Sequence, residues 1–205
     1  MSVGLRKRIT GYTEKTMENR QTGAGAYFKN YDVETDTFTK AVATGKLLGA
    51  TQGGGSFTAK PIITPVEVDG VPSAAKGMEE VDGWEVDMTA NILEVTAENI
   101  QFALGAANIT TTTDGKYKKI TGKSNIDPSD YIDNVTFLGT VSGFDEPIII
   151  QIYNALAVDG LSINPQDKKT TIVPTKFKAH VSFENLDEPP FAIFVPVKVE
   201  SESGQ

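Results

Sequence analysis

The sequence predicts a mainly β protein: an antiparallel β-sandwich or partly closed barrel with one short flanking α-helix. Two observations carry this prediction. The 205 residues include 23 threonines, 17 valines and 16 isoleucines, and such β-branched residues favour the pleated, half-buried surface of a strand. Several segments also alternate apolar and polar residues with the period of two that is typical of strands. The length suits a single domain.

The N-terminal quarter shows little periodicity. Residues 1–22 have no apolar pattern and are expected to form an extended arm, followed by a strand over Ala24–Val33. Residues 35–56 are rich in glycine and are predicted to form a long loop, which in a compact domain is usually functional or mobile. Because Leu47 and Leu48 lie inside it, we expect this loop to bury them against another surface.

Two strands are predicted in the next segment. Residues 57–71 alternate but contain Pro61 and Pro65. Because proline cannot donate to a ladder, this segment should be an edge strand or a bulged strand. Residues 84–95 have the clearest alternation in the chain, with one apolar face and one polar face.

One helix is predicted, over residues 97–104. Thr96 is a suitable N-cap and Gly105 can end the helix. Between these signals lies an apolar stripe at helical spacing, formed by Ala97, Ile100, Ala103 and Leu104.

The C-terminal half is predicted to form five further strands. They cover residues 116–121, 131–141, 147–158, 172–184 and 191–199. Asp114-Gly115 precedes the first of them and favours a tight hairpin turn. In the segment 172–184, alternation points one set of side chains to the core: Phe177, Ala179, Val181 and Phe183. The domain is expected to span residues 23–199, and residues 200–205 are expected to fray.

Composition excludes several classes of protein. The chain has no cysteine and a single histidine, His180, so neither thiol chemistry nor a multi-histidine metal site is available. Its 27 acids outnumber its 19 basic residues, which disfavours a surface that grips nucleic acid through phosphates. No apolar run is long enough to span a membrane, and no secretory signal is expected.

Charge is distributed unevenly along the chain. Residues 1–30 hold six basic residues and two acids, whereas residues 61–105 hold nine acids and one lysine. A basic arm of one copy on the acidic body of another is one interpretation of this asymmetry. Two solvated surfaces without a partner are the simpler interpretation, because charge distribution bears on association and not on fold.

No motif indicates catalysis. The triplet Gly53–Gly55 lacks the Gly-Lys-Ser/Thr ending of a phosphate loop. Asp127 and Asp130 lie in a segment that reads most simply as a turn. His180 falls on the polar face of a predicted strand. We therefore expect neither an enzyme nor a cofactor or metal site.

Several segments together resemble a known family. They are Gly25–Phe28, Leu48–Gly54 (LGATQGG), Val66–Val71 (VEVDGV), Met78–Glu80, Val86–Glu98, Asn154–Leu156 with Gly160–Ser162, and Phe177–His180. In their order and spacing the chain resembles the major tail proteins, or tail tube proteins, of long-tailed bacteriophages, in particular those of Gram-positive hosts. The resemblance covers residues 24–199; the first 22 residues do not align with it.

The resemblance implies a structural role. Six copies would form a ring around a shared β-barrel, and stacked rings would form a tube whose acidic lumen lets DNA pass without specific binding. The partners would be further copies of the chain and other tail proteins such as the tape measure and the tail terminator. The protein would be assembled in the host cytoplasm and reside in the virion tail.

Candidate interface residues follow from this expectation. Contacts within or between rings are expected at Arg6, Arg8, Leu47, Leu48, Phe57, Phe191 and Ile193, and lumen-facing acids at Glu85 and Asp87. The alternatives are the tube of a phage-derived bacteriocin particle or secretion system, and a monomeric β-sandwich module for adhesion or carbohydrate binding.

Overall fold

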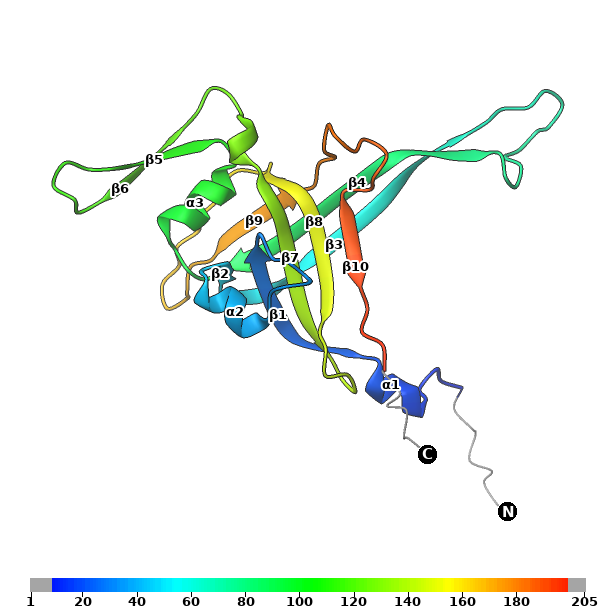
Figure 1. Ribbon diagram of the computed structural model, residues 1–205, viewed down its shortest axis with the longest axis horizontal. Coiled ribbons are helices and arrows are strands. Elements are labelled where there is room, and N and C mark those ends of the chain that lie inside the picture. Colours follow the sequence, from blue (N-terminus) through cyan, green and yellow to red (C-terminus); the bar gives the residue numbers. More distant parts are fainter. Residues whose placement is uncertain (1–8, 199–205) are drawn as a thin grey trace, which may run out of the picture.

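Two antiparallel β-sheets share one strand, β8 (Ile148–Ala157) (Figure 1). The computed structural model describes residues 9–198. One sheet contains β2 (Leu47–Gly49), β1 (Gln21–Lys29), β7 (Ile132–Val141), β8 and β10 (Phe191–Phe194). The other contains the end of β8, β9 (Val173–Lys178), β4 (Glu79–Ile92) and β3 (Thr51–Pro65). The prediction of a mainly β, antiparallel sandwich is confirmed.

The two sheets are joined at both sides. Up to Ala155, β8 pairs with β7 and β10, and its last two residues then pair with β9. At the other side, the chain passes directly from β2 to β3 through Ala50. The carbonyl of Ala50 accepts a hydrogen bond of 2.8 Å from the Leu93 N–H, which ties this crossover to the end of β4.

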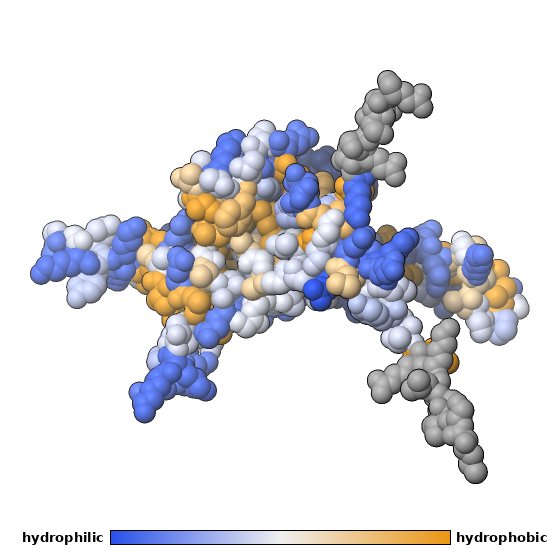
Figure 2. Space-filling view, turned by 90° about the horizontal axis from the view of Figure 1, so that it is seen from below, coloured by the Kyte–Doolittle hydropathy of each residue, from blue (hydrophilic) through white to orange (hydrophobic). Residues whose placement is uncertain are grey.

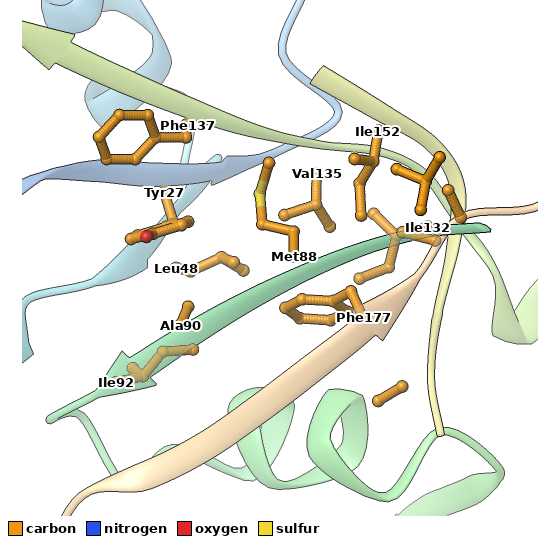
Figure 3. Packing of buried hydrophobic residues seen from close by; sticks show 14 residues of the cluster. Tyr27, Leu48, Met88, Ala90, Ile92, Ile132, Val135, Phe137, Ile152 and Phe177 are labelled. Atoms are coloured by element: carbon orange, nitrogen blue, oxygen red, sulfur yellow. The ribbon is translucent and has the colours of Figure 1, made fainter. Parts of the chain in front are cut away.

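The main core fills the space between the sheets. Phe177, Met88 and Ile152 are fully buried there (Figure 3). A smaller cluster lies on the other face of β1 and β7, where Phe28 and Leu138 pack beside α2 (Phe38–Ala43). Strand β7 is thus buried on both faces, as its continuous apolar run predicts.

The predicted helix is confirmed as α3 (Ala97–Leu104). The Thr96 hydroxyl accepts a hydrogen bond of 3.1 Å from the Asn99 N–H, and Gly105 ends the helix at φ +74°. The structure contains two further short helices that the sequence did not indicate, α1 (Glu14–Glu18) and α2. With five and six residues, they are too short to leave a periodic apolar pattern.

Two hairpins extend from the sandwich. The outer part of β3 and β4 runs well beyond the body, and β3 has β4 as its only partner strand within residues 9–198, so the edge strand expected from Pro61 and Pro65 is confirmed. The second hairpin pairs β5 (Ala107–Thr111) with β6 (Lys118–Gly122) in a sheet of its own. Its turn contains Gly115 at φ +68°, in agreement with the Asp-Gly signal.

The expected long loop at residues 35–56 is wrong. This segment contains α2, β2 and the start of β3. Gly49, Gly53 and Gly54 lie inside or next to strands, where each adopts a positive φ. The sequence does not predict these elements, because a three-residue strand and a glycine-rich strand contain too few apolar residues to alternate with polar ones.

Two predicted strands are shorter than expected. Strand β9 ends at Lys178, and Val181 and Phe183 are exposed instead of facing the core. The N–H of His180 bonds to the carbonyl of Tyr153, after which the chain turns away from the sheet. Strand β10 ends at Phe194. Residues 195–198 of the predicted strand 191–199 have no regular secondary structure, and residues 199–205 lie outside the described part.

Candidate assembly surface

Strands β3 and β10 each keep one backbone edge without a partner strand in the described chain. β3 pairs with β4 alone, and β10 pairs with β8 alone. Unpaired N–H and C=O groups along a strand edge form a template for another strand. Prolines at 61 and 65 remove two donors from the β3 edge, which restricts pairing there to particular registers.

Exposed apolar side chains follow the β10 edge toward the C-terminus. Ile193 is 46% exposed and Val195 66% exposed, and Phe194 and Val197 are exposed as well. Contiguous exposed apolar residues of this kind are often found at interaction sites. Of the residues proposed from the sequence, Ile193 lies on this surface.

Phe57 and Phe191 have a different role from the one expected. Their ring centroids are 5.9 Å apart, and that of Phe191 is 5.1 Å from Trp84. All three are partly buried and pack against the main core. This aromatic cluster therefore packs β10 of one sheet against β3 and β4 of the other.

Leu48 does not belong to the surface. It is 3% exposed and lies in the main core, because pairing of β2 with β1 turns it inward. Leu47 points to the opposite face and is half-buried against the smaller cluster. The interface role expected for Leu48 is therefore wrong, and Leu47 offers only part of its side chain. Arg6 and Arg8 lie outside the described residues.

The outer part of the β3–β4 hairpin, residues 61–83, is here called the β3–β4 arm. It carries exposed apolar residues together with exposed acids. The apolar ones are Ile62, Ile63, Val66, Val68, Val71 and Val81. The arm extends away from the body, and its end includes apolar surface (Figure 2, right-hand end). An arm of this shape has no core of its own to cover these side chains.

The second hairpin, residues 107–122, is here called the β5–β6 arm. Its base is held by α3, since the Gln101 side-chain amide donates to the Ala107 carbonyl over 2.8 Å. The Lys123 ammonium at the base contacts Asp130 at 2.6 Å and Asp127 at 3.1 Å, and these contacts raise the pKa of Lys123 and lower that of Asp130. The tip is hydrophilic (Figure 2, left-hand end), with Tyr117 71% exposed beside lysines.

The N-terminal and C-terminal parts of the described chain lie side by side. Lys198 contacts Glu18 of α1 at 2.7 Å and lies over the ring of Phe144. The hydrogen bond and charge of Lys198 lower the pKa of Glu18. Helix α1 therefore lies next to the C-terminal end of the described chain.

Glu85 and Asp87 lie on the outer face of β4, opposite buried Val86 and Met88, as alternation predicts. Each has a lysine nearby: Lys60 is 3.9 Å from Glu85, and Lys176 is 3.5 Å from Asp87. This face of the sheet therefore carries charges of both signs.

The turn after β9 begins before residue 184, where the strand was predicted to end. Phe183 is 87% exposed and Leu186 68% exposed in a segment that was expected to be a core strand and its loop. Alternation alone predicts that a segment has two different faces. It does not predict whether either face packs against a core. The two adjacent prolines, Pro189 and Pro190, are the one sequence feature that marks where the surface turn ends.

His180 lies beside a hollow lined mainly by polar residues in the described part of the chain. His180 is half-buried, its ring packs against Tyr131, and its Nδ1 lies 3.0 Å from the Asn154 carbonyl. The adjoining hollow of about 250 Å³ also holds Asp133 and Glu188. Among residues 9–198, no three His, Cys, Asp or Glu side chains are grouped so as to hold a metal ion.

No helix within residues 9–198 has the length and apolar character needed to cross a bilayer. No protein-family model matches the chain, and no curated protein matches it. The surface itself is therefore the basis for assigning a role.

Proposed function

We propose that this chain is a structural subunit that assembles with further copies into rings and a stacked tube, as in the tail of a long-tailed bacteriophage. The observation that carries the proposal is the location of the unpaired strand edges and the exposed apolar side chains. Free strand edges and exposed apolar residues occupy projecting hairpins and terminal segments rather than a cleft. Such surface is covered by association and not by a small ligand.

Of the free strand edges in the described chain, those of β3 and β10 belong to opposite sheets of one sandwich. A contact between the β3 edge of one copy and the β10 edge of the next joins different surfaces, which makes it heterologous. Heterologous contacts form closed rings when the rotation between copies closes, and continuous filaments when it does not. Lateral closure into a six-membered ring and axial stacking of rings are the form we propose.

Passage of DNA is the role we propose for the channel of such a tube. The chain carries a net charge of −8, which opposes retention of phosphates. Glu85 and Asp87 on the outer face of β4 are the acids proposed to face the channel. The lysines beside them reduce the local charge, so the repulsion comes from the excess of acids over the whole surface.

The remaining parts of the proposal follow from the tube. A tail tube needs a tape measure protein to set its length and a terminator to cap it, and its place is the virion. A tube of a bacteriocin particle or a secretion system uses the same subunit contacts, and the cargo in the channel distinguishes it from a phage tail.

Electron microscopy of the purified chain tests the proposal directly. We expect negative-stain images to show rings or tubes with a central pore, and sedimentation velocity to show the same species. Val195→Asp should abolish these assemblies because it places a charge on the apolar C-terminal stretch. Val158→Asp is the matched control, since Val158 is an exposed valine that follows β8 and lies outside β3, β10 and the residues of both arms. A wild-type chain that stays monomeric at its solubility limit, and binds glycans, would contradict the proposal.

A further inference from the structure

We propose that the β5–β6 arm of one copy binds the β3–β4 arm of the next copy through opposite charges. This inference rests on the proposed self-assembly and names the surfaces that carry it. The occupant of each arm is thus a second copy of the same chain.

The β3–β4 arm is strongly acidic. Its exposed acids outnumber its single lysine, Lys76, and are Glu67, Asp69, Glu79, Glu80 and Asp82. None of them has an ion-pair partner within the described part of the chain. Asp82 accepts a hydrogen bond from the Thr64 hydroxyl across the hairpin. Because a hydroxyl is neutral, this bond does not neutralise the charge of Asp82.

The β5–β6 arm has the opposite sign. Lys116, Lys118 and Lys119 are exposed at its tip, against one acid, Asp114. Asp114 is engaged locally, since it accepts hydrogen bonds from the Thr112 hydroxyl and the Lys116 N–H. Within residues 9–198 the three lysines form no ion pair. The two arms are therefore complementary in charge, and their exposed charges form no ion pairs with the rest of residues 9–198.

The arms project from opposite ends of the molecule along its longest axis (Figure 1). They do not meet within one chain, so a contact between them has to join two chains. Because the contact joins two different surfaces, each copy can accept one neighbour at each end, and the contact repeats. Charge complementarity also gives the contact a register, since like arms repel.

Apolar groups accompany the charges on both arms. Tyr117 is 71% exposed on the β5–β6 arm, and Val66, Val68 and Val81 are exposed on the β3–β4 arm. A two-stranded hairpin in water has little stability of its own. Contact between the arms would cover these side chains and stabilise both hairpins.

Cysteine cross-linking tests the contact, because the chain has no cysteine of its own. Glu80→Cys and Lys118→Cys are introduced into separate chains, which are mixed and assembled before mild oxidation. We expect disulfide-linked heterodimers in the mixture and little cross-linking with either variant alone. Efficient homodimers of each variant, or no heterodimer from assembled particles, would overturn the inference.

Charge reversal gives the energetic test. Lys118→Glu/Lys119→Glu and Glu79→Lys/Glu80→Lys should each raise the protein concentration needed for assembly by roughly tenfold or more. The chain with all four substitutions should assemble like the wild type, because attraction is restored with the signs exchanged. Lys168→Glu/Lys169→Glu is the control, since this exposed pair lies between β8 and β9 and outside both arms.

These outcomes distinguish failure of the proposed arm contact from failure of the proposed tube. If the wild type assembles and all reversal variants assemble at the same concentration, the arm contact is wrong while the tube proposal stands. If the wild type never assembles, both are wrong. Circular dichroism of each variant excludes loss of the sandwich as the cause of a defect.

Discussion

Gly55 occupies a position in β3 that has no room for a side chain. A Cβ placed there would lie 2.1 Å from the Thr89 carbonyl oxygen and 2.2 Å from the Tyr27 hydroxyl. Gly55→Ala should therefore destabilise the fold by about 1–3 kcal/mol, the usual cost of overpacking. Urea unfolding followed by tryptophan fluorescence measures this. Gly122→Ala is the control, because a Cβ at Gly122 meets nothing within 4 Å, and an equal loss in both variants would contradict the steric explanation.

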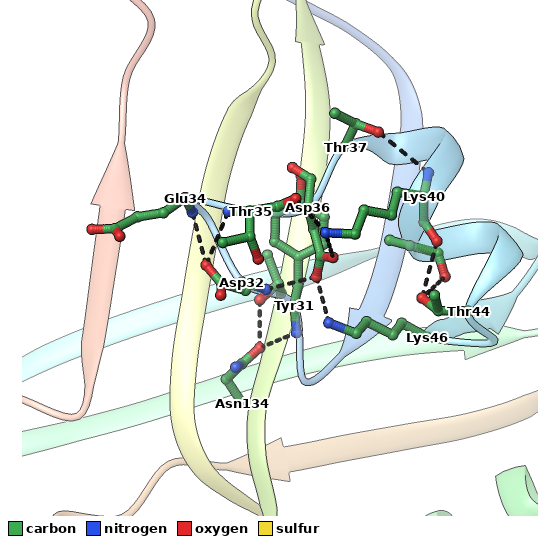
Figure 4. Close-up of polar contacts among 12 residues, drawn as sticks. Tyr31, Asp32, Glu34, Thr35, Asp36, Thr37, Lys40, Thr44, Lys46 and Asn134 are labelled. Atoms are coloured by element: carbon green, nitrogen blue, oxygen red, sulfur yellow. Dashed lines mark hydrogen bonds and ion pairs between the residues drawn. The ribbon is translucent and has the colours of Figure 1, made fainter.

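Asp36 connects the segment before α2 to the rest of the sheet (Figure 4). Its carboxylate accepts a hydrogen bond of 2.9 Å from the Asp32 N–H and contacts Lys46, with Lys40 at 3.8 Å. These contacts lower the pKa of Asp36, the hydrogen bond from Asp32 most strongly. The folded pKa lies below the unfolded value, so the stabilisation is present above the ordinary pKa of 3.8 and is lost as pH falls through the folded pKa.

Asp36→Asn should consequently lower the free energy of unfolding at pH 7. The difference from the wild type should shrink as the pH falls below about 4, since the carboxylate becomes protonated in both states of the wild type. Urea unfolding at a series of pH values checks this. Asp167→Asn, in the exposed segment between β8 and β9, is the matched control for the loss of one carboxylate. A pH-independent deficit in Asp36→Asn would show that shape and not charge is responsible.

At the scale of elements, the β3–β4 arm is separable from the sandwich. The residues of the arm are exposed or half-buried, and the buried part of β4 begins at Val86. Replacing residues 64–80 with Asn-Gly would join Ile63 to Val81, which lie opposite each other in the hairpin, through a favoured turn. We expect a folded monomer that no longer assembles, detected by circular dichroism and sedimentation velocity.

Deleting residues 45–55 is the informative contrast. That change removes β2, buried Leu48 and the start of β3, and loss of a buried leucine alone typically costs about 2–5 kcal/mol. We expect this chain to be unfolded rather than assembly-deficient. A folded product would show that the crossover from β2 to β3 is dispensable.

For the whole molecule, assembly should change hydrogen exchange only where the surface is unpaired. Strands β7 and β8 have partners on both sides and should already be protected in the dilute monomer. On assembly we expect new protection in residues 61–83, 107–122 and 191–198. Exchange mass spectrometry of monomeric and assembled protein measures this, and protection gained mainly in β7 or β8 would instead indicate folding on assembly.

Much of the fold could be predicted from local patterns. The helix capped by Thr96 and Gly105 and the edge character imposed by Pro61 and Pro65 agree with the structure. The strand predicted at residues 84–95 is present as β4, with bounds of Glu79–Ile92. Each depends on backbone chemistry or a period within a few residues, so it can be read without knowing the neighbours. The candidate surface was predicted less well: Ile193 is exposed, whereas Leu48 is buried and Phe57 and Phe191 hold the two sheets together.

By itself, then, the sequence determined the class of fold and the approximate positions of its main strands along the chain. It also determined that the chain has no thiol. Only the tertiary structure decided which apolar residues are covered. Val181 and Phe183 continue the alternation of β9 but extend past its last paired residue, while Leu48 sits in a glycine-rich segment and is buried by pairing with β1. Alternation specifies two faces of a strand, and burial depends on whether another strand or sheet lies opposite, which is a property of distant parts of the chain.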